Sequence, residues 1–471
     1  MINLPRIIVA GVRGGSGKTT LSLAITASLR SAHGLKVIPY KKGPDYIDAG
    51  WLSMAAHHPC YNLDPFLVSK EKVVHSFLDH FVGDIAVIEG NRGLFDGMDA
   101  EGAYSTAELA KLLKVPVILI VDCTKMTRTT AAVVQGFTNF DGDVMIKGIV
   151  LNQIAGSRHE SVIREAIERY CSVPVVGAIP RLRQGEMPER HMGLTPHYEH
   201  KNAKGAISFA ETLAGKYLDM PKIIDIARSA ETLDMPLSES ITAPCLPSVE
   251  ATGSGRNIRI GVFRDAAFQF YYPENLEELQ KCGVEIVGIN AIESTALPTV
   301  DALYIGGGFP ETNALKLAQN ESFRVSLKDA ADRGLPIYAE CGGLMFLGEA
   351  IIMAGQRFQM AGIFPLVFEM RQRPEAHGYT VVEVDHTNPF YPVGTLLHGH
   401  EFHYSAVLDY DEKENMFSAF KMKRGRGIAD KRDGICYRNV LGTYTHIHAL
   451  GSPAWVSGLI NMAKEYKEKN V

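Results

Sequence analysis

The stretch Gly11-Val12-Arg13-Gly14-Gly15-Ser16-Gly17-Lys18-Thr19-Thr20 follows an apolar run, Ile7 to Ala10, and precedes a helical pattern, Leu21 to Leu29. A strand, a glycine-rich loop and a helix in this order favour phosphate binding. Glycines let successive backbone N–H groups converge on phosphate oxygens, and the helix N-terminus adds its positive dipole end. Lys18 would add a full positive charge, and the Thr19 hydroxyl would contact Mg²⁺. The nucleotide-binding residues predicted here are Gly14, Gly15, Ser16, Gly17, Lys18, Thr19 and Thr20.

The glycine spacing departs from the strict P-loop pattern, because Val12 occupies the first glycine position and the nearest glycine is Gly11. The loop resembles the deviant version found in MinD/ParA-type ATPases and in ATP-dependent synthetases that activate carboxylates. Arg13 stands where MinD-like ATPases carry a signature lysine, which argues against an ATPase driven by a partner. A glycine-rich turn with a surface lysine is the structural alternative.

Length and composition indicate a globular protein of more than one domain. The 471 residues exceed one ordinary core, and the 21% charged and 46% apolar fractions are typical of globular chains. A net charge of −5 gives no reason to expect a nucleic-acid partner. We find no apolar run of membrane-spanning length and no signal peptide, and therefore expect a cytoplasmic protein. The 7 cysteines form no C-x-x-C pair, so we expect neither a disulfide framework nor a zinc site.

The first half of the chain alternates short apolar runs with amphipathic segments. This rhythm predicts an α/β fold, a doubly wound P-loop NTPase-like parallel sheet over residues 1–236, with ligands at the carboxyl ends of the strands. The runs expected as strands are Ile7–Ala10, Lys36–Tyr40, Ile85–Glu89, Val117–Asp122, Gly148–Asn152 and Val175–Ile179.

Acidic residues follow two of these runs. Lys41, Lys42, Asp45 and Asp48 are expected in one loop, and Glu89 ends the next run, ahead of Asp96. Carboxylates at neighbouring strand ends can hold Mg²⁺ opposite nucleotide phosphates. Caps of turns and helices are the alternative role for the three aspartates. Further on, Arg190 and His191 are candidates for contact with an anionic ligand, or else parts of a solvated loop.

A stretch rich in Ser, Thr, Pro and Gly predicts a linker over 237–256, and the α/β rhythm resumes over 257–471. The run Leu335–Ala339 leads into Glu340-Cys341-Gly342-Gly343 and a helical pattern. A cysteine at such a turn is exposed near a helix N-terminus and suits a nucleophile, although free cysteines are commonly buried small hydrophobes. His446, in a strand end over 442–448, is the candidate base for Cys341. The histidine-rich segment 398–405 lacks the helical pair of a zincin, so we do not expect zinc there.

The motifs K-G-P-D-Y-I-D, E-G-N-x-G-L-F-D-G, P-E-R-H-x-G-L, G-G-G-F-P-E, C-G-G and T-x-H-x-H follow the phosphate loop in order. This order resembles the CbiA/CobB family of amide ligases over nearly the whole chain. The resemblance implies a dethiobiotin-synthetase-like ATPase domain followed by a triad-type glutamine amidotransferase domain. It further implies ATP- and Mg²⁺-dependent amidation of two acetate carboxylates, the a and c groups, of a tetrapyrrole, with glutamine as the nitrogen donor. The tetrapyrrole favoured by the resemblance is cobyrinate, an intermediate of cobalamin biosynthesis.

The resemblance also assigns roles residue by residue. It implies that Cys341 is the glutaminase nucleophile, that His446 is its partner and that Gly308 and Gly342 donate to the oxyanion. The implied metal ligands are Thr19, Asp45 and Glu89, and the residues implied to lie toward the substrate are Asp45, Tyr46, Asp48 and Asp96. The partners expected are small molecules, neither nucleic acid nor membrane is expected, and a homodimer is one assembly that the sequence allows.

Two questions stay open in the sequence. Triad-type amidotransferases carry Glu two residues after the histidine, whereas this chain has His448 there, so the third member is missing or comes from elsewhere. Relatives that amidate sirohydrochlorin-type rings share nearly the same motifs and provide an alternative substrate. A MinD/ParA-like switch ATPase is the alternative of a different class, and the cysteine-containing stretch after Gly255 speaks against it.

Overall fold

The computed structural model describes residues 3–182, 189–190, 193–194, 202–233, 258–408 and 416–470, with backbone only at 189–190 and 193–194. The chain divides into two compact units, Met1–Glu239 and Ser240–Val471. The linker predicted over 237–256 lies outside the described residues. His191 also lies outside them.

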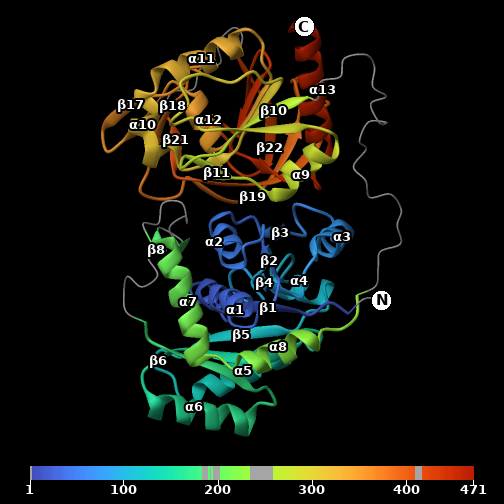
Figure 1. Cartoon of the computed structure of the whole chain (residues 1–471), viewed down its shortest axis with the longest axis vertical. Helices are drawn as coiled ribbons and strands as arrows, with labels where there is room; N and C mark the ends of the chain where they lie inside the picture. The colour runs from blue at the N-terminus through green and yellow to red at the C-terminus, as the bar shows by residue number, and fades with distance from the viewer. Residues whose placement is uncertain are drawn as a thin grey trace. The chain divides into compact units, whose positions relative to one another are not determined.

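The first unit is built on a 7-stranded parallel sheet of order β3-β2-β4-β1-β5-β6-β7 (Figure 1). Its α/β class and parallel pairing confirm the fold predicted from the alternating pattern. The central strands are buried at every position, because helices cover both faces. The strands are β1 (Arg6–Gly11), β2 (Val37–Lys42), β3 (Tyr61–Leu63), β4 (Ile85–Glu89), β5 (Val117–Asp122), β6 (Ile146–Ile154) and β7 (Val175–Pro180). The edge strand β3 was not predicted, because three residues are too few to give a periodic pattern.

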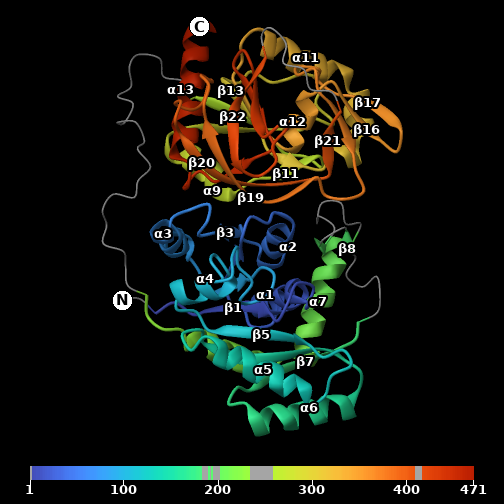
Figure 2. The same ribbon diagram turned by 180° about the vertical axis from the view of Figure 1, so that it is seen from behind.

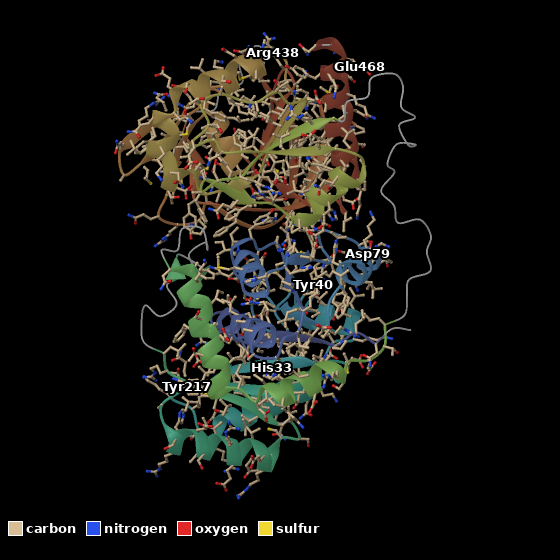
Figure 3. All side chains as sticks on the ribbon, viewed as in Figure 1. His33, Tyr40, Asp79, Tyr217, Arg438 and Glu468 are labelled. Atoms are coloured by element: carbon tan, nitrogen blue, oxygen red, sulfur yellow. The ribbon has the colours of Figure 1, made fainter. Side chains whose placement is uncertain are left out.

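The helices of this unit are α1 (Lys18–Ser31), α2 (Ile47–Ala56), α3 (Lys70–His80), α4 (Thr106–Leu112), α5 (Thr129–Phe140), α6 (Ser157–Tyr170), α7 (Ala203–Tyr217) and α8 (Met220–Arg228). One core cluster joins α1, α2, α7 and α8 to one face of the sheet. On the other face, the ring of Tyr40 in β2, which is labelled in Figure 3, packs on α3. Its centroid lies 4.9 Å from that of Phe77 in this helix. A short hairpin is formed by β8 (Glu189–Arg190) and β9 (Gly193–Leu194).

The expectation that Lys41, Lys42 and Asp48 share a loop is wrong. Both lysines belong to β2, and Asp48 lies in the first turn of α2. Strand β2 continues past its apolar run because Lys41 is paired in register with Glu89 of β4, whose carboxylate offsets the buried ammonium. Neighbour pairing thus extends a strand that residue preference alone would end.

The second unit contains a 10-stranded mixed sheet of order β12-β10-β13-β15-β24-β23-β22-β19-β20-β25. The first five of these strands are parallel, in line with the α/β rhythm predicted over 257–471. The antiparallel remainder was not predicted, because its strands alternate polar and apolar residues irregularly. The strands of this sheet are β10 (Arg259–Phe263), β12 (Glu285–Ile289), β13 (Ala302–Ile305), β15 (Ile337–Glu340), β19 (Ala376–Val384), β20 (Leu396–His403), β22 (Phe417–Arg424), β23 (Arg432–Tyr437), β24 (Val440–Thr443) and β25 (His446–Ile447).

Two smaller sheets complete the strands of this unit. They pair β11 (Phe268–Phe270) with β14 (Gly307–Gly308), and join β16 (Ala350–Met353), β17 (Gln356–Gln359), β18 (Val367–Met370) and β21 (Ser405–Val407). The helices are α9 (Pro273–Lys281), α10 (Ala314–Gln319), α11 (Glu321–Asp332), α12 (Gly342–Leu347) and α13 (Pro453–Asn470).

Alternation along the strands separates the two faces of the large sheet. Tyr304 and Tyr338 share a core cluster with α9 and α13, while Leu303 and Ile337 belong to the cluster that includes α10, α11 and α12. Both views show α13 and α11 on opposite sides of the sheet (Figures 1 and 2).

In the described ranges, no helix is long and apolar enough to cross a membrane.

Candidate functional sites

The phosphate loop connects β1 to α1, which begins at Lys18. Gly17 adopts a φ of 97° and Gly15 a φ of 72°, values that favour glycine. A Cβ on Gly17 would lie 2.5 Å from Nδ2 of Asn152, which donates to the Ser16 carbonyl at 2.9 Å. Strand β6, which carries Asn152, therefore fixes the loop, and the glycine at 17 is required both by its φ and by this close approach.

Two cationic side chains of the loop differ in their surroundings. Lys18 is buried, which lowers its pKa, and its Nζ lies 3.5 Å from the Arg13 carbonyl. Arg13 is exposed and its Nη2 pairs with Asp122 Oδ2 at 2.8 Å. Lys18 is thus held close to the loop backbone, which is the position needed to meet phosphate oxygens.

Beside the loop, Asp45, Asp48 and Glu89 form an acid cluster around the ammonium of Lys41. Lys41 Nζ lies 2.8 Å from Asp48 Oδ2, 3.0 Å from Glu89 Oε1 and 3.6 Å from Asp45 Oδ2. The Thr19 hydroxyl donates to Glu89 Oε1 at 2.7 Å. The structure therefore brings four residues predicted for metal or substrate binding together, and places at their centre a lysine that the sequence did not assign to a role.

The acid cluster has perturbed protonation. Burial raises the pKa of Glu89 to about 7 although Lys41 opposes this, and burial together with Asp48 raises the pKa of Asp45 to about 6. Burial alone would raise the pKa of Asp48, but the Lys41 ammonium outweighs it and lowers that pKa. Glu89 Oε2 is buried and accepts no hydrogen bond from any described residue. An oxygen of this kind next to a threonine hydroxyl suits a cation that arrives with its phosphate ligand.

The remaining predicted residues of this unit lie nearby with different surroundings. Tyr46 occupies the N-cap position of α2, between the two aspartates in the sequence, without a side-chain capping hydrogen bond. Asp96 is exposed and accepts from the Gly93 N–H at 2.9 Å, which is the turn-capping role given as the alternative, while its charge acts on Lys18. Among the residues described, no group of three or more His, Cys, Asp or Glu is arranged to hold a metal by itself. Any Mg²⁺ would therefore also need the threonine and phosphate oxygens.

In the second unit, Cys341 lies at the sharp turn between β15 and α12. It is 6% exposed, so the expectation of an exposed cysteine is wrong, because the core around the turn packs over it. Its φ of 46° and ψ of −98° are unusual for a residue with a side chain, and its N–H donates to the Thr443 carbonyl at 2.7 Å. A Cβ on Gly342 would lie 3.0 Å from the backbone nitrogen of Gly308. The two glycines predicted to donate to an oxyanion therefore adjoin each other and the thiol.

His446, in β25, meets Cys341 and a buried carboxylate. Its Nδ1 lies 3.2 Å from Oε2 of Glu340. Burial alone would lower the pKa of His446, but hydrogen bonding with the Cys341 thiol and with Glu340 raises it to about 10. The pair expected from the sequence is assembled, and Glu340 was missed. The signal that identified Glu89, an acid ending a buried strand, also marks Glu340.

A second buried carboxylate holds the segment that precedes His446. Asp433 accepts from the hydroxyls of Thr443 at 2.7 Å and Thr445 at 3.0 Å, and from the N–H groups of Tyr444 and Thr445 at 3.0 and 3.1 Å. No sequence motif marks Asp433. The contacts exist because β23 and β24 pair as neighbours.

His448 occupies the position at which triad-type amidotransferases carry glutamate, but it faces Glu274 and not His446. Its Nε2 lies 3.6 Å from Oε1 of Glu274, and both side chains are buried.

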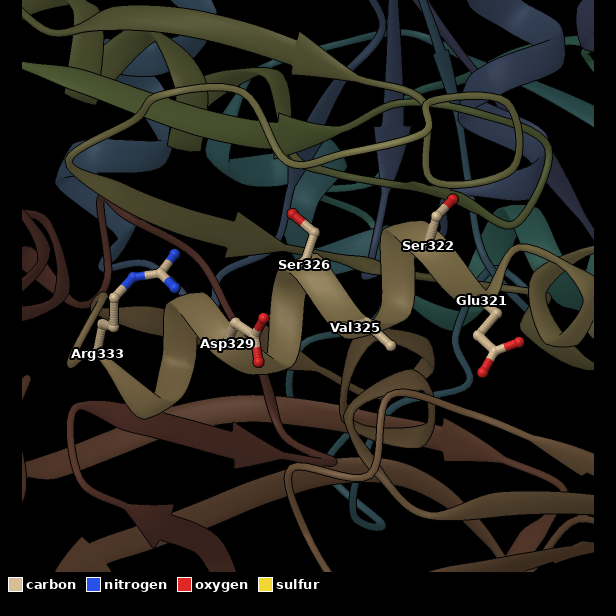
Figure 4. A pocket seen from close by; sticks show the side chains of 6 residues that line it. All are labelled: Glu321, Ser322, Val325, Ser326, Asp329 and Arg333. Carbon is tan, nitrogen blue, oxygen red and sulfur yellow. The ribbon is translucent and has the colours of Figure 1, made fainter.

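A separate surface depression of about 630 Å³ runs along α11 (Figure 4) and contains none of the predicted site residues. It is lined by Glu321, Ser322, Val325, Ser326, Asp329 and Arg333.

A phosphate-loop unit followed by a unit with a cysteine–histidine pair at a strand–helix turn defines the class of glutamine-dependent, nucleotide-using amide ligases. The CobQ/CobB/MinD/ParA nucleotide binding domain family matches residues 7–194, so the first unit is nucleotide-binding. The CobB/CobQ-like glutamine amidotransferase domain family matches residues 259–454.

Three relatives named cobyrinate a,c-diamide synthase align over nearly their full length. The Magnetococcus marinus protein is 42% identical and aligns over 98% of both chains. The Archaeoglobus fulgidus protein is 37% identical over 99% of both chains. The Listeria innocua protein is 36% identical over 98% of this chain and 99% of its own. This chain belongs to the cobyrinate a,c-diamide synthase family, which confirms the resemblance inferred from the motif order.

Proposed function

We propose that this protein uses ATP and glutamine to convert the a and c acetate carboxylates of cobyrinate into amides in cobalamin biosynthesis. The observation that carries this proposal is that one chain contains a site suited to each half-reaction. These sites are a phosphate loop beside an acid cluster, and a cysteine–histidine pair. Full-length relatives named cobyrinate a,c-diamide synthase support the substrate. They do not favour the sirohydrochlorin-type ring or the MinD/ParA-like switch.

The first unit would activate the carboxylate. A carboxylate is a poor electrophile, so a substrate oxygen attacks the γ-phosphorus of ATP, the bond to ADP breaks and an acyl phosphate forms. Ammonia then attacks the acyl carbon, the C–O bond to the phosphate breaks, and the proton lost from the nitrogen leaves with the phosphate. Lys18 and the backbone N–H groups of the loop stabilise the charge that develops on the phosphate oxygens.

The residues of the acid cluster fit Mg²⁺. Thr19, Glu89 and Asp45 would hold the ion, and the buried Glu89 Oε2 is the oxygen with spare capacity. Bound there, the ion would supply positive charge opposite the transferred phosphoryl group. Asp45, Tyr46, Asp48 and Asp96 are our candidates for positioning the substrate carboxylate.

The second unit would release ammonia from glutamine. His446 takes the proton of the Cys341 thiol, and the sulfur attacks the side-chain amide carbon. The C–N bond breaks as His446 returns the proton to the departing nitrogen, leaving a thioester. Water then hydrolyses the thioester to glutamate. The N–H groups of Gly308 and Gly342 are our candidates for the oxyanion donors.

Mass spectrometry of parallel incubations tests the proposal. Protein with ATP, Mg²⁺ and glutamine is given cobyrinate, sirohydrochlorin or nickel-sirohydrochlorin, and we expect a diamide from cobyrinate together with ADP, phosphate and glutamate. Cys341→Ala should lose the reaction with glutamine and retain it with ammonium. A diamide formed only from a sirohydrochlorin would reject the substrate, and full glutamine use by Cys341→Ala would reject the nucleophile. A homodimer and a cytoplasmic location stay predictions from the sequence.

A further inference from the structure

We propose that Glu340, the residue directly before the nucleophile, is the positioning carboxylate of the glutaminase site and takes the place of the missing third triad member. This inference rests on the proposed glutaminase role of Cys341 and His446. It goes further by assigning a function to a carboxylate that lies outside the family's triad pattern.

Both oxygens of Glu340 are fixed by contacts around His446. Oε2 lies 3.2 Å from His446 Nδ1 and accepts from the Tyr304 hydroxyl at 3.2 Å. Oε1 accepts from the backbone N–H of Ile447 at 3.3 Å. The Glu340 side chain is 0% exposed and that of His446 is 2% exposed, so water does not compete for this pair. The carboxylate therefore holds both the imidazole and the backbone that carries it.

A further amide ties the same backbone in place. Asn275 Nδ2 donates to the Ile447 carbonyl at 3.1 Å and to the Tyr304 hydroxyl at 3.2 Å, and its Oδ1 accepts from the Ala449 N–H at 2.7 Å. Asn275 is itself 0% exposed. Glu340 is thus part of a closed buried network, in which a change at one member alters the orientation of His446.

The strained turn explains how neighbours in sequence reach one site. Successive side chains of a strand point to opposite faces, so Glu340 and an extended Cys341 would diverge. The positive φ of Cys341 ends the strand sharply, and Glu340 stays paired in register with Thr443, three residues before His446. Chain neighbours therefore act on one imidazole from two sides.

The position where the family pattern expects a glutamate has a different partner. His448 faces Glu274, at 3.6 Å, rather than His446. The ring of His400 stacks on that of His446 with 4.9 Å between centroids, and burial keeps the pKa of His400 well below 6.5. Glu340 is accordingly the carboxylate that faces the His446 imidazole. Other titratable groups beside this pair include Cys341, His400 and His403, together with Tyr304, which donates to Glu340.

The chemistry follows from this geometry. When Nδ1–H donates to Glu340, the Nε2 lone pair is the one available to the thiol. The S–H bond of Cys341 breaks, an Nε2–H bond forms, and the resulting imidazolium is stabilised by the Glu340 charge. The same proton later passes to the departing ammonia. Glu340 touches neither substrate nor sulfur, so its effect is on orientation and on charge.

The test compares Glu340→Gln, Glu340→Asp and the matched control Glu274→Gln in the full chain. Glu274 is also a buried glutamate beside a buried histidine, but its histidine is not the one at the cysteine. We expect Glu340→Gln to lower kcat for glutamine hydrolysis about 100-fold or more, since loss of the triad carboxylate costs serine proteases about 10⁴-fold in kcat. Activity with ammonium should stay within about twofold of wild type, because that reaction needs only the first unit.

A second readout separates positioning from a general loss of structure. The rate at which iodoacetamide alkylates Cys341, followed on its peptide by mass spectrometry, is measured against pH. We expect the midpoint to move upward by about 1 pH unit or more in Glu340→Gln and by less in Glu340→Asp, with Glu274→Gln at the wild-type value.

Each outcome bears on one of the two proposals. Normal glutamine turnover in Glu340→Gln, or lowered turnover with an unmoved alkylation profile, overturns the role of Glu340. Should Glu340→Gln fail to fold, Glu340→Asp decides on the same two readouts. Glutamine hydrolysis that survives in Cys341→Ala would instead reject the proposed function itself.

Discussion

The substitution Lys41→Met removes a buried charge while keeping most of the side-chain volume, and we expect a large loss of stability in the first unit. Lys41 is 2% exposed and its Nζ lies 2.8 Å from Asp48 and 3.0 Å from Glu89. Removing one partner of a buried ion pair leaves the other charge uncompensated and costs about 3–5 kcal/mol. We expect a loss in this range at pH 8.

A matched control is available at Lys111. Its Nζ also meets two carboxylates, Glu108 at 2.6 Å and Asp141 at 2.9 Å, but its side chain is 29% exposed. Exposed pairs of this kind contribute about 0–1 kcal/mol. Lys111→Met should therefore cost less than about 1 kcal/mol, and its effect should shrink in high salt, unlike that of Lys41→Met.

The chain allows each unit to be followed separately. It has 2 tryptophans, Trp51 in α2 and Trp455 in α13, at 1% and 0% exposure. In a Trp455→Phe background, urea unfolding measured by fluorescence reports the first unit through Trp51. Equal urea midpoints for Lys41→Met and its parent, or equal losses for the two lysine variants, would refute the reasoning.

The sign of the pH dependence is also fixed. Carboxyls whose pKa is raised in the folded state destabilise that state as pH rises through the folded pKa. The pKa values of Asp45 and Glu89 are about 6 and 7 with Lys41 present, and removal of its charge would raise them further. The deficit of Lys41→Met should therefore be largest above about pH 7 and decrease below about pH 6.

Three further outcomes are expected. Gly17→Ala should weaken ATP binding at least about tenfold by calorimetry, because residue 17 has a φ of 97° and its Cβ would lie 2.5 Å from an amide nitrogen. The loss should exceed that of the control Gly14→Ala, whose Cβ meets nothing within 4 Å. Because Mg²⁺ needs an ionised carboxylate and the pKa of Glu89 is about 7, Mg²⁺ affinity in the presence of ATP should rise from pH 6 to 8, with proton release that Glu89→Gln reduces. Asp433→Asn should destabilise the second unit by about 2–3 kcal/mol, because charge-assisted hydrogen bonds are lost. Urea unfolding monitored through Trp455 fluorescence in a Trp51→Phe background measures this loss, and a loss under about 0.5 kcal/mol would contradict the expectation.

The sequence alone identified the elements whose signals are local. The phosphate loop was predictable because glycine spacing, an apolar run and a helical pattern occur within about twenty residues of chain. Cys341 was predictable for the same reason, since a strand, a cysteine and two glycines adjoin. Parallel strands also carry their polar residues at one edge, so Asp45 and Glu89 could be expected near the loop before any contact was known.

Tertiary structure alone decided which charges meet. Lys41 lies within the acid cluster because β2 is the neighbour of β4 and pairs Lys41 with Glu89, a register that no local pattern contains. Glu340 meets His446 because β15 pairs with β24 and places Glu340 opposite Thr443, three residues before the histidine. Strand order and register arise from packing between distant segments. The sequence therefore identified the phosphate loop, the cysteine and several of the acids. The fold added Lys41 and Glu340, determined the partners of every group and, through burial and charge, set their protonation.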